Sequence, residues 1–164
     1  GHARLLGRLE QWREIHLPVL CAGEGHGMTE ILTIYDTSAQ APAIRFELPW
    51  PAKVLNPNRS GGAHWAVKGR AVRDARQYAM ATCRNEASAR RFTVPAGARV
   101  DIQLLGVPAT RRNRDLDNFL ASCKAYLDGI SDALGVNDVR FNPSAAFCLP
   151  GKPAKVIVTV RAVM

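Results

Sequence analysis

The chain has 164 residues, of which 47% are hydrophobic, and it carries a formal net charge of +8 at pH 7. This length and apolar content allow one domain with a core of its own, which excludes wholesale disorder. The positive charge favours a polyanionic partner, with nucleic acid first and a membrane surface second.

Residues 1–27 are predicted to be an N-terminal extension. Apolar residues at helical spacing predict a short helix over residues 3–17, and the following CAGEGHG ends it. Met28 could be the natural start, because Gly1-His2 resembles a remnant of cloning and a new pattern opens at Met28. We therefore expect residues 28–164 to form the folded domain.

The folded part shows a mixed α/β pattern. Alternating or continuous apolar residues predict strands at 30–36, 43–50, 99–107, 138–150 and 154–163. Prolines, asparagines and paired glycines predict a loop at 51–65. A helix rich in alanine and arginine is expected over 66–89, and a second helix begins near Asp117.

From residue 43 onward these elements have the order β-α-β-α-β-β. The PGKP stretch at 150–153 predicts a hairpin turn between the last two strands. The expected fold class is α+β: a single domain with a small mixed β-sheet and two main helices packed on it.

Two carboxylates lie inside the most basic segment, RRNRDLDNFLASCKAYLDG at 111–129. Asp115 could be the N-cap of the helix, with Asp117 in its first turn opposing the macrodipole, which stabilises by about 0.5–2 kcal/mol without any catalysis. The pair could also hold a hard cation such as Mg²⁺, which prefers carboxylate oxygens. The crowding of Arg111, Arg112 and Arg114 favours this second interpretation, because a polyanion would relieve their repulsion.

The helix after this pair has two faces. One is an apolar stripe with steps of three and four residues: Phe119, Leu120, Cys123, Leu127, Ile130 and Leu134. On another face lie Asp117, Lys124 and Asp128, because seven residues make nearly two turns. A substrate between Asp117 and Lys124, roughly 10 Å apart along the axis, could touch both.

A third carboxylate, Asp138, follows this helix, and by itself it could be an ordinary turn residue.

A second group of candidate residues lies in the loop at 51–65 and in the helix after it: Asn56, Asn58, Arg59, His64, Trp65, Lys68, Arg70, Arg73 and Arg76. Trp65 could stack on an unpaired base while the basic residues bind phosphates. It could also anchor the loop on the core, with the basic residues forming a solvated helix face.

The stretch RRNRDLDNFLASCKAYLDGISDALGVNDVRF resembles the RusA family of Holliday junction resolvases, which phages and prophages typically encode. The resemblance covers about residues 43–163, because LPWPAKVLNPNRSGGAHWAVKGRA also resembles the family's opening strand and loop. It departs from the family in two places: Ala121 stands where the family has its lysine, which moves to Lys124, and only Asp138 remains of a later acidic pair.

The resemblance implies an Mg²⁺-dependent endodeoxyribonuclease that resolves four-way junctions in DNA recombination and repair, with Mn²⁺ as a possible substitute. It implies that Asp115, Asp117 and Asp138 are metal ligands and that Lys124 is catalytic. The expected DNA contacts are Arg111, Arg112, Arg114, Asn118, Asn58, Arg59, Trp65, Lys68 and Arg73. The two-fold symmetry of a junction implies a homodimer with an isologous interface.

Three other functions fit the same residues. The metal site could serve a broader endonuclease that acts on flaps and other branched DNA. The aspartates could be helix caps in a non-enzymatic nucleic-acid-binding module. A phage scaffold or assembly protein is favoured only if DNA binding is absent.

The cysteines bear on the cellular compartment. There are four, far apart and without a C-x-x-C pair: Cys21, Cys83, Cys123 and Cys148. This spacing disfavours structural zinc and a disulfide framework, so we expect reduced, mostly buried thiols in the cytoplasm of a bacterial or phage-infected cell.

No apolar run approaches the ~20 residues of a membrane-spanning helix. We expect no membrane association and no signal peptide, although HLPVLCAG faintly resembles a lipoprotein cleavage site.

Overall fold

The computed structural model describes residues 42–59 and 65–164. The elements are β1 (Ala43–Pro49), α1 (Trp65–Ala89), β2 (Arg99–Val107), α2 (Leu116–Ser122), α3 (Lys124–Leu134), β3 (Phe141–Phe147) and β4 (Lys155–Val163), with short 3-10 helices η1 (Lys53–Leu55), η2 (Pro57–Arg59) and η3 (Asp138–Arg140). The α+β class and the order β-α-β-α-β-β are confirmed. The helix predicted at 3–17, the strand predicted at 30–36 and the boundary at residue 28 lie outside the described residues.

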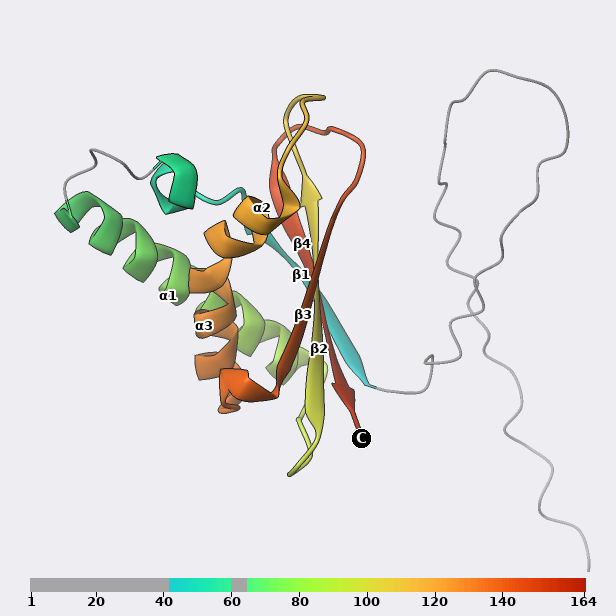
Figure 1. Ribbon diagram of the computed structural model, residues 1–164. Coiled ribbons are helices and arrows are strands. Elements are labelled where there is room, and N and C mark those ends of the chain that lie inside the picture. Colours follow the sequence, from blue (N-terminus) through green and yellow to red (C-terminus); the bar gives the residue numbers. More distant parts are fainter. Residues whose placement is uncertain (1–41, 60–64) are drawn as a thin grey trace, which may run out of the picture. The chain divides into compact units, whose positions relative to one another are not determined.

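One face of the sheet is buried under the helices, which all lie on the same side of it (Figure 1). In β1 the side chains of Ile44, Phe46 and Leu48 are buried and their neighbours are exposed, as the period of two in a strand requires. The same alternation buries Val100, Ile102 and Leu104 of β2 and Val156, Val158 and Val160 of β4. Each such side chain contributes about 1.5–3 kcal/mol when removed from water.

The sheet order is β1-β4-β2-β3, so the predicted hairpin between the last two strands is wrong. β3 pairs in parallel with β2, while β4 lies between β1 and β2 and is antiparallel to both. The segment between β3 and β4 instead crosses the end of β2. There the Cys148 N–H donates to the Gly106 carbonyl at 3.0 Å and the Gly151 N–H to the Pro108 carbonyl at 2.9 Å. The PGKP turn therefore carries the chain across β2.

The single helix predicted from Asp117 is two helices that run in different directions (Figure 1). Cys123 lies between α2 and α3 with φ −88° and ψ 0°, and its N–H points towards the carbonyls of the preceding turn. Its buried thiol packs in the core. The expected apolar stripe is retained, because Phe119, Leu127 and Ile130 are buried on both sides of the bend.

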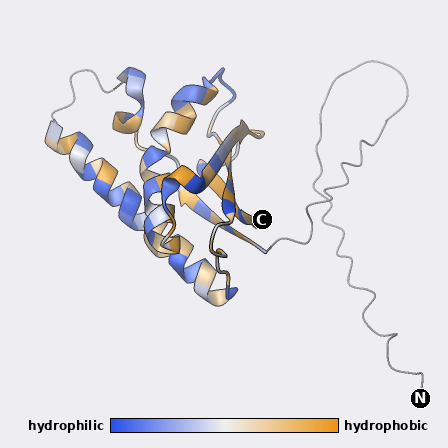
Figure 2. Cartoon of the chain, turned by 60° about the horizontal axis from the view of Figure 1, so that its bottom comes forward, coloured by the Kyte–Doolittle hydropathy of each residue, from blue (hydrophilic) through white to orange (hydrophobic). Residues whose placement is uncertain are grey.

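α3 crosses α1 at very short range through Gly129. A Cβ added at Gly129 would lie 2.2 Å from the Arg76 carbonyl oxygen and 3.0 Å from the Met80 nitrogen. Beside this crossing the guanidinium of Arg76 binds both carboxylate oxygens of Asp132, at 2.5 and 2.9 Å. Hydrophilic residues occupy much of the rest of α1 (Figure 2), and only Ala79 and Cys83 of this helix are buried.

The described cysteines are free thiols. Burial raises the pKa of Cys83 and of Cys123 to about 12, so both stay protonated and unreactive at neutral pH. Buried thiols are therefore confirmed for these two residues, whereas Cys148 is partly exposed and Cys21 lies outside the described residues. In residues 42–59 and 65–164 no helix is both long enough and apolar enough to span a bilayer.

We predict that Gly129→Ala destabilises the domain by about 2–3 kcal/mol, because backbone atoms of α1 block the added methyl group and the helices must separate. The matched control is Gly69→Ala in the same helical layer, where nothing lies within 4 Å of the added Cβ. This change should stabilise α1 by about 0.5–1 kcal/mol through helix propensity. Urea denaturation measures both, and equal effects would contradict the close crossing.

Candidate functional site

Asp115 begins α2 as its N-cap. Its Oδ1 accepts hydrogen bonds from the backbone N–H groups of Asp117 at 2.9 Å and Asn118 at 3.2 Å, and its backbone is extended. Its Oδ2 accepts a hydrogen bond from Asn118 Nδ2 at 2.6 Å. The helix-cap interpretation of Asp115 is therefore confirmed, and the Asn118 amide orients this carboxylate.

Two pockets lie along α2. The first, here called the tryptophan pocket, has a volume of about 510 Å³. It is lined by Trp50, Pro51, Ala52, Lys53, Asn56, Asn58, Ala109, Thr110, Arg112, Asn113, Arg114, Asp115, Asn118, Phe119, Ser122, Phe147 and Ala154. The second, the lysine pocket, has a volume of about 540 Å³ and is lined by Asp117, Leu120, Ala121, Lys124, Leu127, Asp138, Phe141 and Pro143. α2 contributes residues to both pockets and so forms a wall between them.

The lysine pocket brings together three of the predicted catalytic residues: Asp117, Lys124 and Asp138. The Lys124 ammonium donates to Asp138 Oδ2 and to Asp128 Oδ1, both at 2.8 Å. These hydrogen bonds raise the pKa of Lys124 and lower the pKa of Asp138 from their ordinary values. Asp138 is therefore ionised and Lys124 charged at neutral pH, and the site is a compact ion-paired group open to solvent.

The fourth predicted residue, Asp115, lines the tryptophan pocket. Within the described part of the chain, no three His, Cys, Asp or Glu side chains are grouped so as to hold a metal ion. Mg²⁺ is commonly held by one or two carboxylates, with waters and substrate phosphates as its other ligands. Asp117 and Asp138 are donors of that kind, and both line the lysine pocket.

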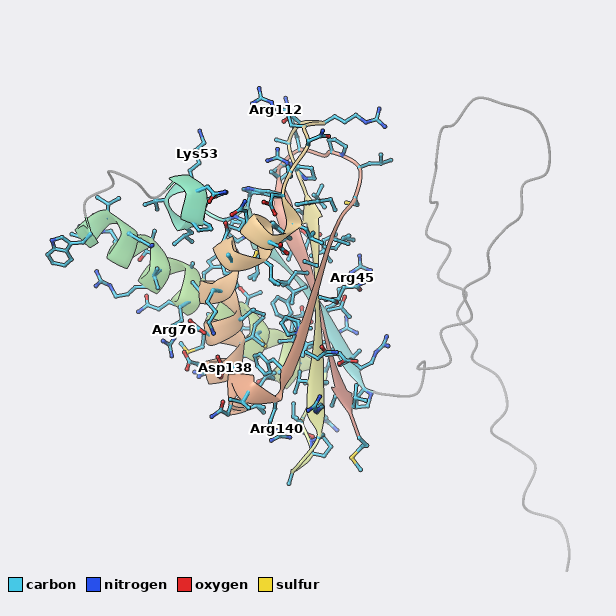
Figure 3. All side chains as sticks on the ribbon, viewed as in Figure 1. Arg45, Lys53, Arg76, Arg112, Asp138 and Arg140 are labelled. Carbon is cyan, nitrogen blue, oxygen red and sulfur yellow. The ribbon has the colours of Figure 1, made fainter. Side chains whose placement is uncertain are left out.

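The arginine loop, residues 111–114, follows β2 and is fully exposed. Arg114 lies over the Trp50 ring, 5.1 Å from its centroid, and its Nη2 is 3.5 Å from the Thr110 hydroxyl. None of the loop's three arginines forms an ion pair with another described residue. Lys53 and Arg112 extend at the end of the sheet where β2 ends, whereas Asp138 lies towards the opposite end (Figure 3).

The predicted contacts on α1 have mixed outcomes. Trp65 does not anchor the loop on the core, because its side chain is 80% exposed at the start of the helix. Lys68 and Arg73 are also exposed. Arg76 is held by Asp132 in the α1–α3 contact, which gives it a structural role. Arg59 belongs to η2, but its side chain, like His64, lies outside the described residues.

Sequence reasoning missed Trp50 as a site residue and assigned it only to a strand. It also left out Lys53 and Asn113, which line the same pocket as Asn58. The available signal was the LPWP stretch, where a tryptophan at the end of a strand lies between two prolines. β1 and β2 are both antiparallel to β4 and so end at the same edge of the sheet, where Trp50 and Arg114 meet.

Comparisons with known proteins do not assign this chain to a family. No protein-family model matches it. It is 44% identical over 94 residues to a protein of Xylella fastidiosa (strain Temecula1 / ATCC 700964) that is described only as uncharacterized. The match covers 57% of this chain and 60% of the relative, so the chain spans less than two thirds of that protein's length.

We predict that Asp115→Ala lowers the free energy of unfolding by about 0.5–2 kcal/mol, because two backbone N–H groups lose their acceptor. Asp115→Asn retains a side-chain oxygen at the cap and should leave stability nearly unchanged. Urea denaturation of both variants makes the comparison. Equal destabilisation by the two changes would show that the negative charge, and not the cap, matters here.

Proposed function

We propose that this protein is a divalent-cation-dependent endodeoxyribonuclease that cleaves branched DNA, with the four-way junction as its substrate. The observation that carries the proposal is the lysine pocket, where two carboxylates and a lysine from three different elements line one open cavity. The arginine loop beyond α2 supplies positive charge without acidic partners among the described residues. The net charge of +8 and the resemblance of residues 43–163 to the RusA resolvases support the same function.

Asp117 and Asp138 would hold Mg²⁺ or Mn²⁺, which when bound polarises a phosphodiester and activates water. Arg111, Arg112 and Arg114 would bind phosphates that flank the cleaved bond, so DNA affinity should fall steeply with salt. Asp115 would contribute indirectly, because its cap holds the first turn of α2 and thereby positions Asp117.

Lys124 would have two roles. In the free protein its ammonium pairs with Asp128 and Asp138, both at 2.8 Å, and holds the start of α3 against η3. When DNA is bound, the same ammonium would stabilise negative charge that develops on the phosphate.

A homodimer is part of this proposal, because paired incision of a two-fold symmetric junction requires two equivalent active sites.

A second candidate function is a non-enzymatic DNA-binding module. The engagement of Asp115 as a helix cap favours it, since that carboxylate then has a purely structural role.

We predict that Asp117→Asn abolishes Mg²⁺-dependent cleavage of a labelled synthetic four-way junction. Junction binding should remain or become tighter, because a carboxylate that repels phosphates is removed. Asp74→Asn, on the exposed face of α1, is the matched control and should cleave normally. Normal cleavage by Asp117→Asn would contradict the proposed site. If the unmodified protein cleaved junction, flap and linear duplex equally well, its substrate would not be the junction but DNA of broader structure.

We also predict that Lys124→Gln tightens Mn²⁺ binding by up to about fivefold, because the cation no longer competes with the ammonium for Asp138. Calorimetric titration without DNA measures this change, and Lys68→Gln on α1 is the control. Cleavage by Lys124→Gln should nevertheless fall. Weaker Mn²⁺ binding in this variant would place the cation away from Asp138, and absence of Mn²⁺ binding in the unmodified protein would favour the DNA-binding module.

A further inference from the structure

Three aromatic rings, from the end of β1, from α2 and from β3, line one side of the tryptophan pocket. The Trp50 ring is stacked at 5.3 Å and 27° on Phe119, and Phe119 lies 4.9 Å from Phe147. Gly106 of β2 makes room for both phenylalanines, because a Cβ there would lie 2.9 Å from each ring. Trp50 therefore rests on packed rings and is only partly buried.

The backbone that carries Trp50 is also held in place. The Tyr126 hydroxyl of α3 donates to the Pro49 carbonyl at 2.9 Å, and burial raises the pKa of this hydroxyl, so it remains a donor at neutral pH. On the Trp50 ring lies the Arg114 guanidinium, 5.1 Å from the centroid. The Arg114 guanidinium therefore covers the Trp50–Phe119 stack and adds one positive charge to it.

The polar part of the lining includes amides and cations, together with the capped Asp115 carboxylate and two hydroxyl groups. Asn56 is used within the loop, because its Oδ1 accepts the Asn58 N–H at 2.9 Å and fixes the turn. This turn places the exposed Asn58 on one side of the pocket, and Asn113 lines it as well. Asparagine amides donate and accept hydrogen bonds and so match the edge of a nucleobase. Lys53 and Arg112 match the phosphates of the backbone that carries the base.

We propose that the tryptophan pocket binds one unpaired nucleobase of a DNA strand. The base stacks on the Arg114 guanidinium that lies over Trp50, its edge meets Asn58 and Asn113, and the phosphates on either side of it meet Lys53 and Arg112. A pocket of about 510 Å³ is within the usual size range of small-molecule sites. This inference rests on the proposed action on DNA, and it adds recognition of an unstacked base on the opposite side of α2 from the lysine pocket.

The experiment measures binding in EDTA, so that it is independent of cleavage. The probe is a labelled single-stranded oligothymidylate of about eight nucleotides, compared with an abasic strand of the same length and charge. The thymidine strand should bind about tenfold more tightly, because base stacking on Arg114 is lost in the abasic strand. The Asn58→Ala, Asn113→Ala double variant should lose the part of this preference that comes from hydrogen bonds to the base edge and retain its affinity for the abasic strand. Asn85→Ala on the exposed part of α1 is the matched control.

A second measurement does not depend on these variants folding normally. With Trp12 and Trp65 replaced by phenylalanine, Trp50 is the remaining tryptophan, and its fluorescence should be quenched by the thymidine strand and not by the abasic strand. Equal binding of the two strands together with unquenched Trp50 would overturn the inference, even if the protein cleaves junctions. Equally tight binding of free thymidine monophosphate would overturn the assignment to a DNA strand. A base preference that persists in a protein without nuclease activity would support the pocket and refute only the proposed cleavage.

Discussion

The contact between the backbones of α1 and α3 at Gly129 is the constraint on which the site depends. Because Gly129 has no side chain, the Arg76 carbonyl lies where a methyl group would otherwise be, and α3 can pack closely against α1. α3 then buries Ile130 in the core and places Tyr126 against the end of β1. The same helix presents Lys124 to Asp138. One close crossing thus positions residues that line or support both pockets.

The bend at Cys123 also shapes the site. α2 leaves the axis of α3 and becomes a wall with one pocket on each side. Asp115 and Asp117 are two residues apart in the chain, yet they line different pockets. A motif that looks in sequence like one cluster of acids therefore divides into a structural cap and a candidate ligand. The proposed cation site accordingly uses two carboxylates.

Electrostatics distinguishes these two sides. In the lysine pocket one ammonium, that of Lys124, pairs with two carboxylates, so this group of three is net negative. A net negative group is what the proposed cation site requires. Around the tryptophan pocket the arginine loop forms no ion pair with another described residue, and Arg114 stacks on Trp50. Positive charge without acidic partners, next to an aromatic surface, suits attraction of a polyanion and stacking of a base. The two sides would act on one strand that crosses α2.

The sequence alone predicted the strands of residues 43–163, the long helix α1 and the buried stripe through Phe119, Leu127 and Ile130, because these depend on local periodicity. It offered the Asp115 cap as one of two interpretations, since a cap depends on hydrogen bonds to near neighbours. It also indicated Lys124 and Asp138 as one site through a resemblance. Only the tertiary structure decided that β4 lies between β1 and β2, since strand order depends on long-range pairing and not on the PGKP turn. It likewise decided the bend at Cys123 and the role of Trp50, because both arise from packing between segments far apart in the chain.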